Sequence, residues 1–381
     1  MRKRRVLLGL CGVVVIGVAV GIGLHMGGYR HSGGSVPHGG GGTASHTPED
    51  KLACVQALPQ DIQIGQKLML AGYSDQLPGS TAALSQASIG GVIIMDQTPA
   101  AEIATFRGAF KIAPTIGVDQ EGGPVQRYTS EGLLPGAEAM ASGFSAAQAY
   151  QQYLSDDRFL KGMGITTNFA PVLDVISYMP EPLPGRMYSS DPAVVAQYAS
   201  AAIRAAQTAD ITPVVKHFPG LGSTAIDTDY GTATSDPLAT LRTRDLLPYQ
   251  QVSPLKPDAM VGNVIVPDLT DGQPAVWSAA AVKLLRSYGY QDSVVYTDSL
   301  TADAIPGTLE DAVVKAWQAG IDVALVVQTH DHTADVPSYI QSITASADAA
   351  LQSGRLDSKA FAASVLRILD RKGIDPCTLA Y

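Results

Sequence analysis

The chain has 381 residues, of which 46% are hydrophobic and 16% charged, and its net charge is −9. This composition supports a large hydrophobic core and excludes an intrinsically disordered chain. Five of the 26 basic residues lie within the first 30 positions, so the remainder is strongly acidic. An acidic body repels the phosphates of nucleic acids, and no nucleic-acid partner is expected.

The N-terminus combines a basic cluster with a long apolar run. MRKRR (1–5) precedes the uncharged residues 6–24, which as a helix span roughly 28 Å, about one hydrocarbon core. Basic residues before such a helix keep its N-terminus in the cytoplasm. We therefore expect residues 1–25 to form a cytoplasmic tip and a single-pass membrane anchor, with the rest of the chain exported. The alternative is a signal peptide cleaved near Ala19, which gives a secreted protein.

Residues 26–50 are rich in Gly, Ser, His and Thr, a composition typical of a flexible linker. The folded body is then expected at residues 51–381. Cys54 and Cys377 lie at its two ends, and domain termini are often close together in space. We expect these cysteines to form a disulfide in an oxidising compartment, the alternative being two separate thiols.

Eight apolar runs alternate with alanine-rich amphipathic segments along the body. The runs are 65–72, 90–96, 114–123, 166–175, 211–220, 258–267, 292–301 and 322–331. The clearest helical segments are 100–110, 191–209, 279–289 and 309–320, with 359–373 expected to complete an outer ring. The alternation indicates a parallel sheet, and eight units predict an α/β fold of the (β/α)8 TIM-barrel type. An open doubly wound sheet is the alternative, although no strand-linked GxGxxG supports it.

Polar residues collect at the C-terminal ends of these runs. They are Asp119, Glu121, Asp174, Lys216, His217, Asn263, Asp298, Gln328 and His330. In a barrel these ends form one rim, which carries the active site. An aspartate after a strand can instead cap the next helix, as we expect for Asp191. Capping does not explain the Lys216–His217 pair, or Asp298 directly after an apolar strand.

Paired carboxylates are the chemistry that this rim favours, because no G-x-S-x-G elbow and no P-loop is present. Retaining glycoside hydrolysis needs one carboxylate that attacks the sugar and one group that carries a proton. Asp298 follows a buried strand and suits the rigid nucleophile. Asp227 and Asp229 lie on a Gly-rich loop and suit a mobile proton donor. A metal-dependent hydrolase is the alternative, and its candidate ligands would be the body's three histidines, His217, His330 and His332.

Four segments carry a resemblance to a known family. GVDQEGGPVQR (117–127), NFAPVLDV (168–175), KHFPGLGSTAID (216–227) and VVYTDSL (294–300) resemble glycoside hydrolase family 3. The chain is most similar to its single-domain bacterial β-N-acetylhexosaminidases, and the match runs in order from about residue 60 to 330. The resemblance implies a (β/α)8 barrel and retaining hydrolysis of β-linked N-acetylglucosamine, often from cell-wall fragments.

The resemblance also implies roles for individual residues. Asp298 matches the family nucleophile. The positions matching sugar-binding residues are Asp119, Arg127, Arg186, Lys216 and His217, and Asn263 occupies the place of a histidine in the sixth strand and is counted with them. No cofactor and no metal is expected.

One departure from the family pattern concerns the proton carrier. Family members usually have Asp-x-His on the mobile loop, whereas this chain has Asp227-Thr228-Asp229. Two crowded carboxylates raise the pKa of one of them, so Asp229 is expected to replace the histidine as acid. The sequence therefore predicts a membrane-anchored glycosidase acting on cell-envelope glycans. The alternative is a catalytically impaired member that binds glycans or serves as a scaffold, and the sequence predicts no protein partner.

Overall fold

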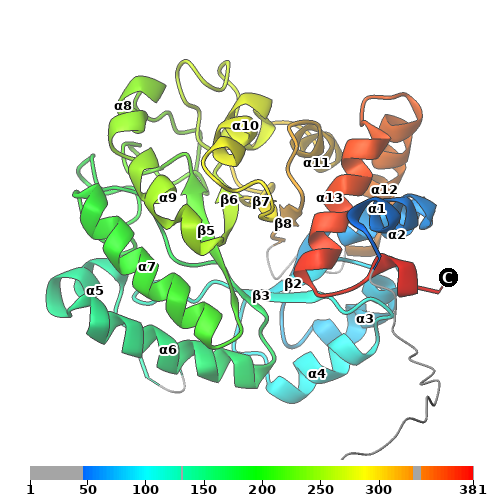
Figure 1. Ribbon diagram of the computed structural model, residues 1–381, viewed down its shortest axis with the longest axis horizontal. Coiled ribbons are helices and arrows are strands. Elements are labelled where there is room, and N and C mark those ends of the chain that lie inside the picture. Colours follow the sequence, from blue (N-terminus) through cyan, green and yellow to red (C-terminus); the bar gives the residue numbers. More distant parts are fainter. Residues whose placement is uncertain (1–45, 130–131, 329–335, 381) are drawn as a thin grey trace, which may run out of the picture. The chain divides into compact units, whose positions relative to one another are not determined.

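A computed structural model describes residues 46–129, 132–328 and 336–380. Its centre is a set of eight parallel strands, each of which lies within one of the predicted apolar runs (Figure 1). The strands are β1 (Leu68–Gly72), β2 (Gly91–Ile94), β3 (Thr115–Val118), β4 (Thr167–Asn168), β5 (Thr212–Phe218), β6 (Asp258–Val261), β7 (Val295–Thr297) and β8 (Ala324–Val326).

The strands close into a barrel. Their order is β7-β6-β5-β4-β3-β2-β1-β8, so β1 lies between β2 and β8. At the remaining seam a parallel bridge joins Tyr296 to Val323, and the amide of Thr297 donates to the carbonyl of Val323 at 2.9 Å. These contacts between β7 and β8 confirm the barrel, and the open-sheet alternative is wrong.

Helices follow the strands and cover the outside of the barrel (Figure 1). They are α1 (Pro48–Ala57), α2 (Gln60–Gln66), α3 (Leu77–Gln86), α4 (Ala100–Gly108), α5 (Ala137–Gly143), α6 (Ala146–Met163), α7 (Pro192–Thr208), α8 (Leu238–Thr243), α9 (Leu246–Val252), α10 (Ala279–Ser287), α11 (Leu309–Gln318), α12 (Val336–Gln352) and α13 (Ser358–Arg371). Asp191 caps α7 as predicted, because its Oδ1 accepts the amide of Ala193 at 2.8 Å.

The core has two parts. Side chains on alternate strand positions fill the barrel interior, among them Met69, Ile93, Phe169 and Met260. The other strand residues pack outward against the apolar faces of the helices and form a larger cluster there. A filled interior leaves the carboxyl ends of the strands as the place for a site.

The last helix departs from its predicted position. We expected residues 359–373 to complete the outer ring, but α12 follows β8 and α13 crosses the amino ends of the strands. Ile368 of α13 packs into the interior cluster, Arg371 pairs with Asp258 at 2.6 Å, and Arg367 pairs with Asp322 at 2.7 Å. Asp258 is the first residue of β6 and Asp322 lies just before β8, so α13 closes the barrel at the end opposite the predicted site.

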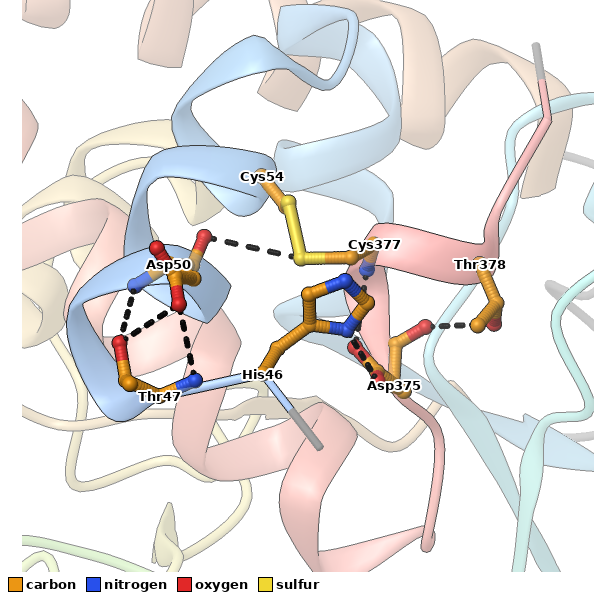
Figure 2. The surroundings of a disulfide bond; sticks show 7 residues. All are labelled: His46, Thr47, Asp50, Cys54, Asp375, Cys377 and Thr378. Atoms are coloured by element: carbon orange, nitrogen blue, oxygen red, sulfur yellow. Dashed lines mark hydrogen bonds and ion pairs between the residues drawn. A yellow bond between two sulfur atoms is a disulfide. The ribbon is translucent and has the colours of Figure 1, made fainter. Parts of the chain in front are cut away.

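A disulfide joins Cys54 of α1 to Cys377, which lies in the short helix η4 (Pro376–Thr378), as predicted (Figure 2). It links residues 323 apart in the sequence, and a closed loop of this size restricts the unfolded chain and stabilises the fold by about 2–4 kcal/mol. Beside it, Nδ1 of His46 lies 2.8 Å from Oδ2 of Asp375, and the Thr47 side chain caps α1.

Helix α1 begins at Pro48, within the range that the sequence assigned to the linker. The predicted membrane anchor and the linker up to Ser45 lie outside the described residues. Within the described part of the chain, no helix combines the length and the apolar character that crossing a membrane requires.

Candidate active site

A cavity of about 310 Å³ opens at the carboxyl ends of the strands. Its floor is apolar and includes Ile93, Met260 and Leu325. Its walls carry nine titratable side chains: Asp119, Glu121, Arg127, Arg186, Lys216, His217, Asp227, Asp229 and Asp298. These residues come from the ends of β3, β5 and β7 and from the loops that follow β3, β4 and β5. The barrel thus brings together side chains that are distant in the sequence.

Lys216 joins two carboxylates on one wall. Its Nζ lies 2.6 Å from Oδ1 of Asp119 and 2.7 Å from Oε1 of Glu121. Burial disfavours ionised Asp119, but the positive charges of Lys216 and Arg127 outweigh burial and lower the pKa of Asp119 to about 2. Burial likewise disfavours ionised Glu121, but the charges of Lys216 and Arg186 outweigh it and lower the pKa of Glu121. Both carboxylates are therefore charged at neutral pH and hold the lysine in one position.

Arg186 extends this cluster from the loop after β4. Its Nε and Nη2 donate to the two oxygens of Glu121 at 2.8 and 2.9 Å, a bidentate pair. Its Nη1 lies 3.5 Å from Oδ2 of Asp227, on the loop after β5. Arg186 therefore connects the loop after β3 to the loop that carries Asp227 and Asp229.

His217 is oriented by Asp174, a fully buried residue at the end of the fourth apolar run. Nδ1 of His217 lies 2.7 Å from Oδ2 of Asp174, and Oδ1 of Asp174 accepts the amide of Leu221 at 2.8 Å. Burial alone would lower the pKa of His217, but the charge of Asp174 outweighs it and raises that pKa. Since Nδ1 is engaged, Nε2 is the ring nitrogen left for a ligand.

Two carboxylates of the cavity stand apart from the ion pairs. Asp119, Glu121 and Asp227 all pair with cations, whereas among the described residues Asp229 and Asp298 have no ion-pair partner. The amide of Ser299 donates to Oδ1 of Asp298 at 2.8 Å and fixes this side chain directly after β7.

Both of these carboxyls have a raised pKa. Burial raises the pKa of Asp298, with the positive charge of His217 acting in the opposite direction. Burial is the largest cause of the raised pKa of Asp229, and the negative charges of Asp298 and Asp227 add to it, so that this pKa is about 6. The side chain still contacts solvent. At neutral pH the cavity therefore holds one carboxyl that gains a proton readily beside another that is fixed.

The loop of Asp229 is held against the segment that follows Asp298. The carbonyl of Asp229 accepts the amide of Asp303 at 3.3 Å, and the carbonyl of Thr228 accepts that of Ala304 at 3.3 Å. Within the loop, the amide of Asp229 donates to Oδ1 of Asp227 at 3.0 Å. These bonds turn the proton-carrier candidate toward the same cavity as Asp298.

A family model described as the N-terminal domain of glycosyl hydrolase family 3 matches residues 64–370. The chain belongs to glycosyl hydrolase family 3. It is 34% identical over 349 residues to a protein named beta-hexosaminidase LpqI from Mycobacterium tuberculosis, covering 87% of this chain and 84% of that one.

Solved structures of this family have the same fold. A family 3 glycosyl hydrolase from Mycobacterium smegmatis aligns with a TM-score of 0.76 at 33% identity, covering 83% of this chain and 98% of that one. A family 3 β-N-acetylglucosaminidase from Paenibacillus aligns with a TM-score of 0.76 at 27% identity, covering 85% and 64%.

The family 3 barrel gathers nearly all of the predicted site residues. Asp298, Asp229, Asp227 and the five predicted sugar-binding residues other than Asn263 line one cavity, although their roles remain predictions. Asn263 does not line this cavity: it is 1% exposed, and its Nδ2 donates to the carbonyl of Ser299 at 2.7 Å, while its Oδ1 is buried without a hydrogen-bond partner among the described residues. Asn263 thus supports the segment after Asp298, and its sugar-binding role stays a prediction.

Sequence reasoning placed Glu121 and Asp174 on the rim but gave neither a role. The structure makes Glu121 the shared partner of Lys216 and Arg186, and Asp174 the partner of His217. The signal for both was their position after a strand, but their partners lie on other strands and were not identifiable from the sequence.

Metal ligands are sparse in the described residues. His330 and His332 lie outside them. One group of possible ligand atoms, from His46, Asp375 and Cys377, lies within 4.8 Å near the disulfide. Because Cys377 is bonded to Cys54, its sulfur cannot act as a thiolate ligand.

Proposed function

We propose that this chain is a retaining glycosidase that releases β-linked N-acetylglucosamine-type sugars from cell-envelope glycans. The observation that carries the proposal is Asp298, a fixed carboxylate without an ion-pair partner among the described residues, on the wall of a cavity lined by hydrogen-bonding groups. The relatives named beta-hexosaminidase support the choice of sugar.

In the first step an oxygen of Asp298 attacks the anomeric carbon and forms a glycosyl-aspartate ester as the glycosidic bond breaks. Asp229 gives its proton to the departing oxygen. In the second step Asp229, now ionised, takes a proton from water, the water oxygen bonds to the anomeric carbon, and the ester bond breaks. The raised pKa of Asp229, about 6, suits a group that alternates between acid and base.

The charged walls suit the recognition of sugar hydroxyls. Lys216 and Arg186 are held by carboxylates and offer fixed donors, while Asp119 offers acceptor oxygens. His217 presents Nε2 from the same strand as Lys216. Positions fixed before the sugar arrives reduce the entropy lost on binding.

A second candidate is a catalytically impaired protein that binds glycans. The observation that favours it is Asp229 at the position where the family pattern has histidine, because a shorter side chain and a repelling neighbour weaken proton transfer. The raised pKa of Asp229 and its place on the cavity wall favour the enzyme.

We also propose that the barrel lies outside the cytoplasm, anchored by residues 6–24. The basic cluster before this run and the Cys54–Cys377 disulfide, which persists in oxidising compartments, support the proposal. We expect the full chain to sediment with membranes and resist extraction by high salt. A chain that begins at residue 46 should stay in the supernatant, and equal sedimentation of the two would contradict the anchor.

A mechanism-based fluorosugar tests the enzyme directly. The purified protein, incubated with an activated 5-fluoro-N-acetylglucosaminyl fluoride, should accumulate a covalent adduct on the peptide that contains Asp298. Mass spectrometry of the digested protein detects it, with an Asp298→Asn variant as the unlabelled control. Labelling elsewhere would refute Asp298 as the nucleophile. No labelling, together with no hydrolysis of any aryl glycoside, would favour the binding protein.

A further inference from the structure

Large apolar side chains are exposed at only one region of the described part of the chain. They are Leu133, Tyr178, Met179, Ile226 and Tyr230. All five lie on the loops that follow β3, β4 and β5, which are the loops that build the cavity walls. None of the five lines the cavity itself. Single exposed apolar residues are ordinary, but their confinement to the three loops that build the cavity walls indicates a binding surface beside it.

These three loops contact one another. The amide of Ser177 donates to the carbonyl of Gly222 at 3.0 Å, which joins the loop after β4 to the loop after β5. Gly136 packs so closely on the carbonyl of Gly185 that an added Cβ would lie 2.7 Å from it, which joins the loop after β3 to the loop after β4. The loops that carry the exposed side chains therefore form one continuous rim.

The position of Asp229 indicates which part of a bound glycoside would lie near this rim. Ile226 and Tyr230 flank it on the same loop, with 43% and 79% of their surfaces exposed. A general acid must lie within hydrogen-bond reach of the departing oxygen. A leaving group within reach of Asp229 therefore lies close to the loop that carries these two residues.

The size of the cavity also places the leaving-group sugar outside it. Its volume of about 310 Å³ is at the small end of ligand pockets, which are roughly 300–1,000 Å³. Such a space suits one sugar ring and its substituent. The next ring of a longer glycan must therefore lie outside, over the rim.

We propose that the rim formed by Tyr178, Met179, Ile226 and Tyr230 is a binding platform for the leaving-group sugar of a disaccharide or longer glycan. A pyranose presents an apolar C–H face, which packs on an aromatic face and is removed from water there. Tyr230 is the specificity-determining residue of this platform. This inference rests on the proposed function, because it takes Asp229 as the acid that protonates the leaving oxygen.

The test compares two substrates that share a non-reducing sugar and differ in the leaving group. One is N,N′-diacetylchitobiose, and the other is methyl β-N-acetylglucosaminide, whose methyl group cannot cover the rim. The quantity measured is the ratio of their kcat/KM values. Tyr230→Ala should lower this ratio roughly three- to tenfold, the range of an aromatic packing contact.

Two matched variants accompany it. Tyr230→Phe keeps the ring and should restore the ratio to that of the unmodified protein. Tyr150→Ala removes a tyrosine from the outer helix α6 and should leave the ratio unchanged. A Tyr230→Ala variant that lowers both kcat/KM values equally, or neither, would overturn the platform.

Failure of the proposed function gives a different result. If the unmodified protein hydrolyses neither substrate, calorimetric titration with the disaccharide and with N-acetylglucosamine replaces kinetics. The platform then requires the disaccharide to bind more tightly, with the difference reduced three- to tenfold in Tyr230→Ala; equal affinities overturn it. Sedimentation with anionic lipid vesicles, or self-association, that Tyr230→Ala abolishes while the substrate ratio stays unchanged would also overturn it.

Discussion

Replacing Asp298 with asparagine should lower the hydrolysis of an aryl β-N-acetylglucosaminide by roughly 10⁴-fold or more, the scale seen when an enzyme loses its nucleophile. The amide is nearly isosteric but does not form the ester intermediate. The measurement is kcat at saturating substrate. The loss should fall on kcat, because the groups that hold the sugar, Lys216 and Arg186, are unchanged.

The control is Asp292→Asn, an exposed aspartate at the opposite end of the same strand region, which should retain full activity. The thermal midpoint of Asp298→Asn should not fall, because burial disfavours the charged carboxylate and the amide removes that charge. Residual activity above about one tenth of that of the unmodified protein would assign the nucleophile to another group.

Replacing Asp229 with asparagine should lower kcat/KM by about 10²–10⁴-fold for a glycoside with a poor leaving group, the usual contribution of a general acid–base group. Dinitrophenolate leaves without a proton, so kcat/KM for a dinitrophenyl glycoside, which reports the glycosylation step alone, should be much less affected. The ratio of the two losses separates the loss of an acid from a general disturbance of the loop. Equal losses for both leaving groups would contradict the role of Asp229.

The pH dependence of kcat/KM follows from the same two carboxyls. The productive form has Asp298 ionised and Asp229 protonated. As the pH rises through about 6, Asp229 loses its proton and kcat/KM for the poor leaving group should fall. As the pH falls, Asp298 gains a proton at a pKa above the ordinary value for aspartate, and kcat/KM should fall again. In Asp229→Asn the limb near pH 6 should disappear, and its persistence would point to a different acid.

The barrel and the location of its site were predictable because their signals are local. An apolar strand is recognised from its own residues, and the residue that follows it, such as Asp119 or Asp298, takes its place on the rim from the strand alone. The disulfide was predictable for a similar reason, because only Cys54 and Cys377 remain in the folded body.

The sequence by itself determined which charged groups reach the cavity, since each is attached to a strand end or to the loop after it. Only the tertiary structure decided which of these groups form ion pairs with one another. Lys216 meets Asp119 across 97 positions of sequence, and Arg186 meets Glu121 across 65. Pairing depends on distances between side chains from different strands, and neither spacing nor composition contains those distances. The same limit explains why the bond from Asn263 to the Ser299 carbonyl and the position of α13 were not predicted, because the closed barrel sets the neighbours of both.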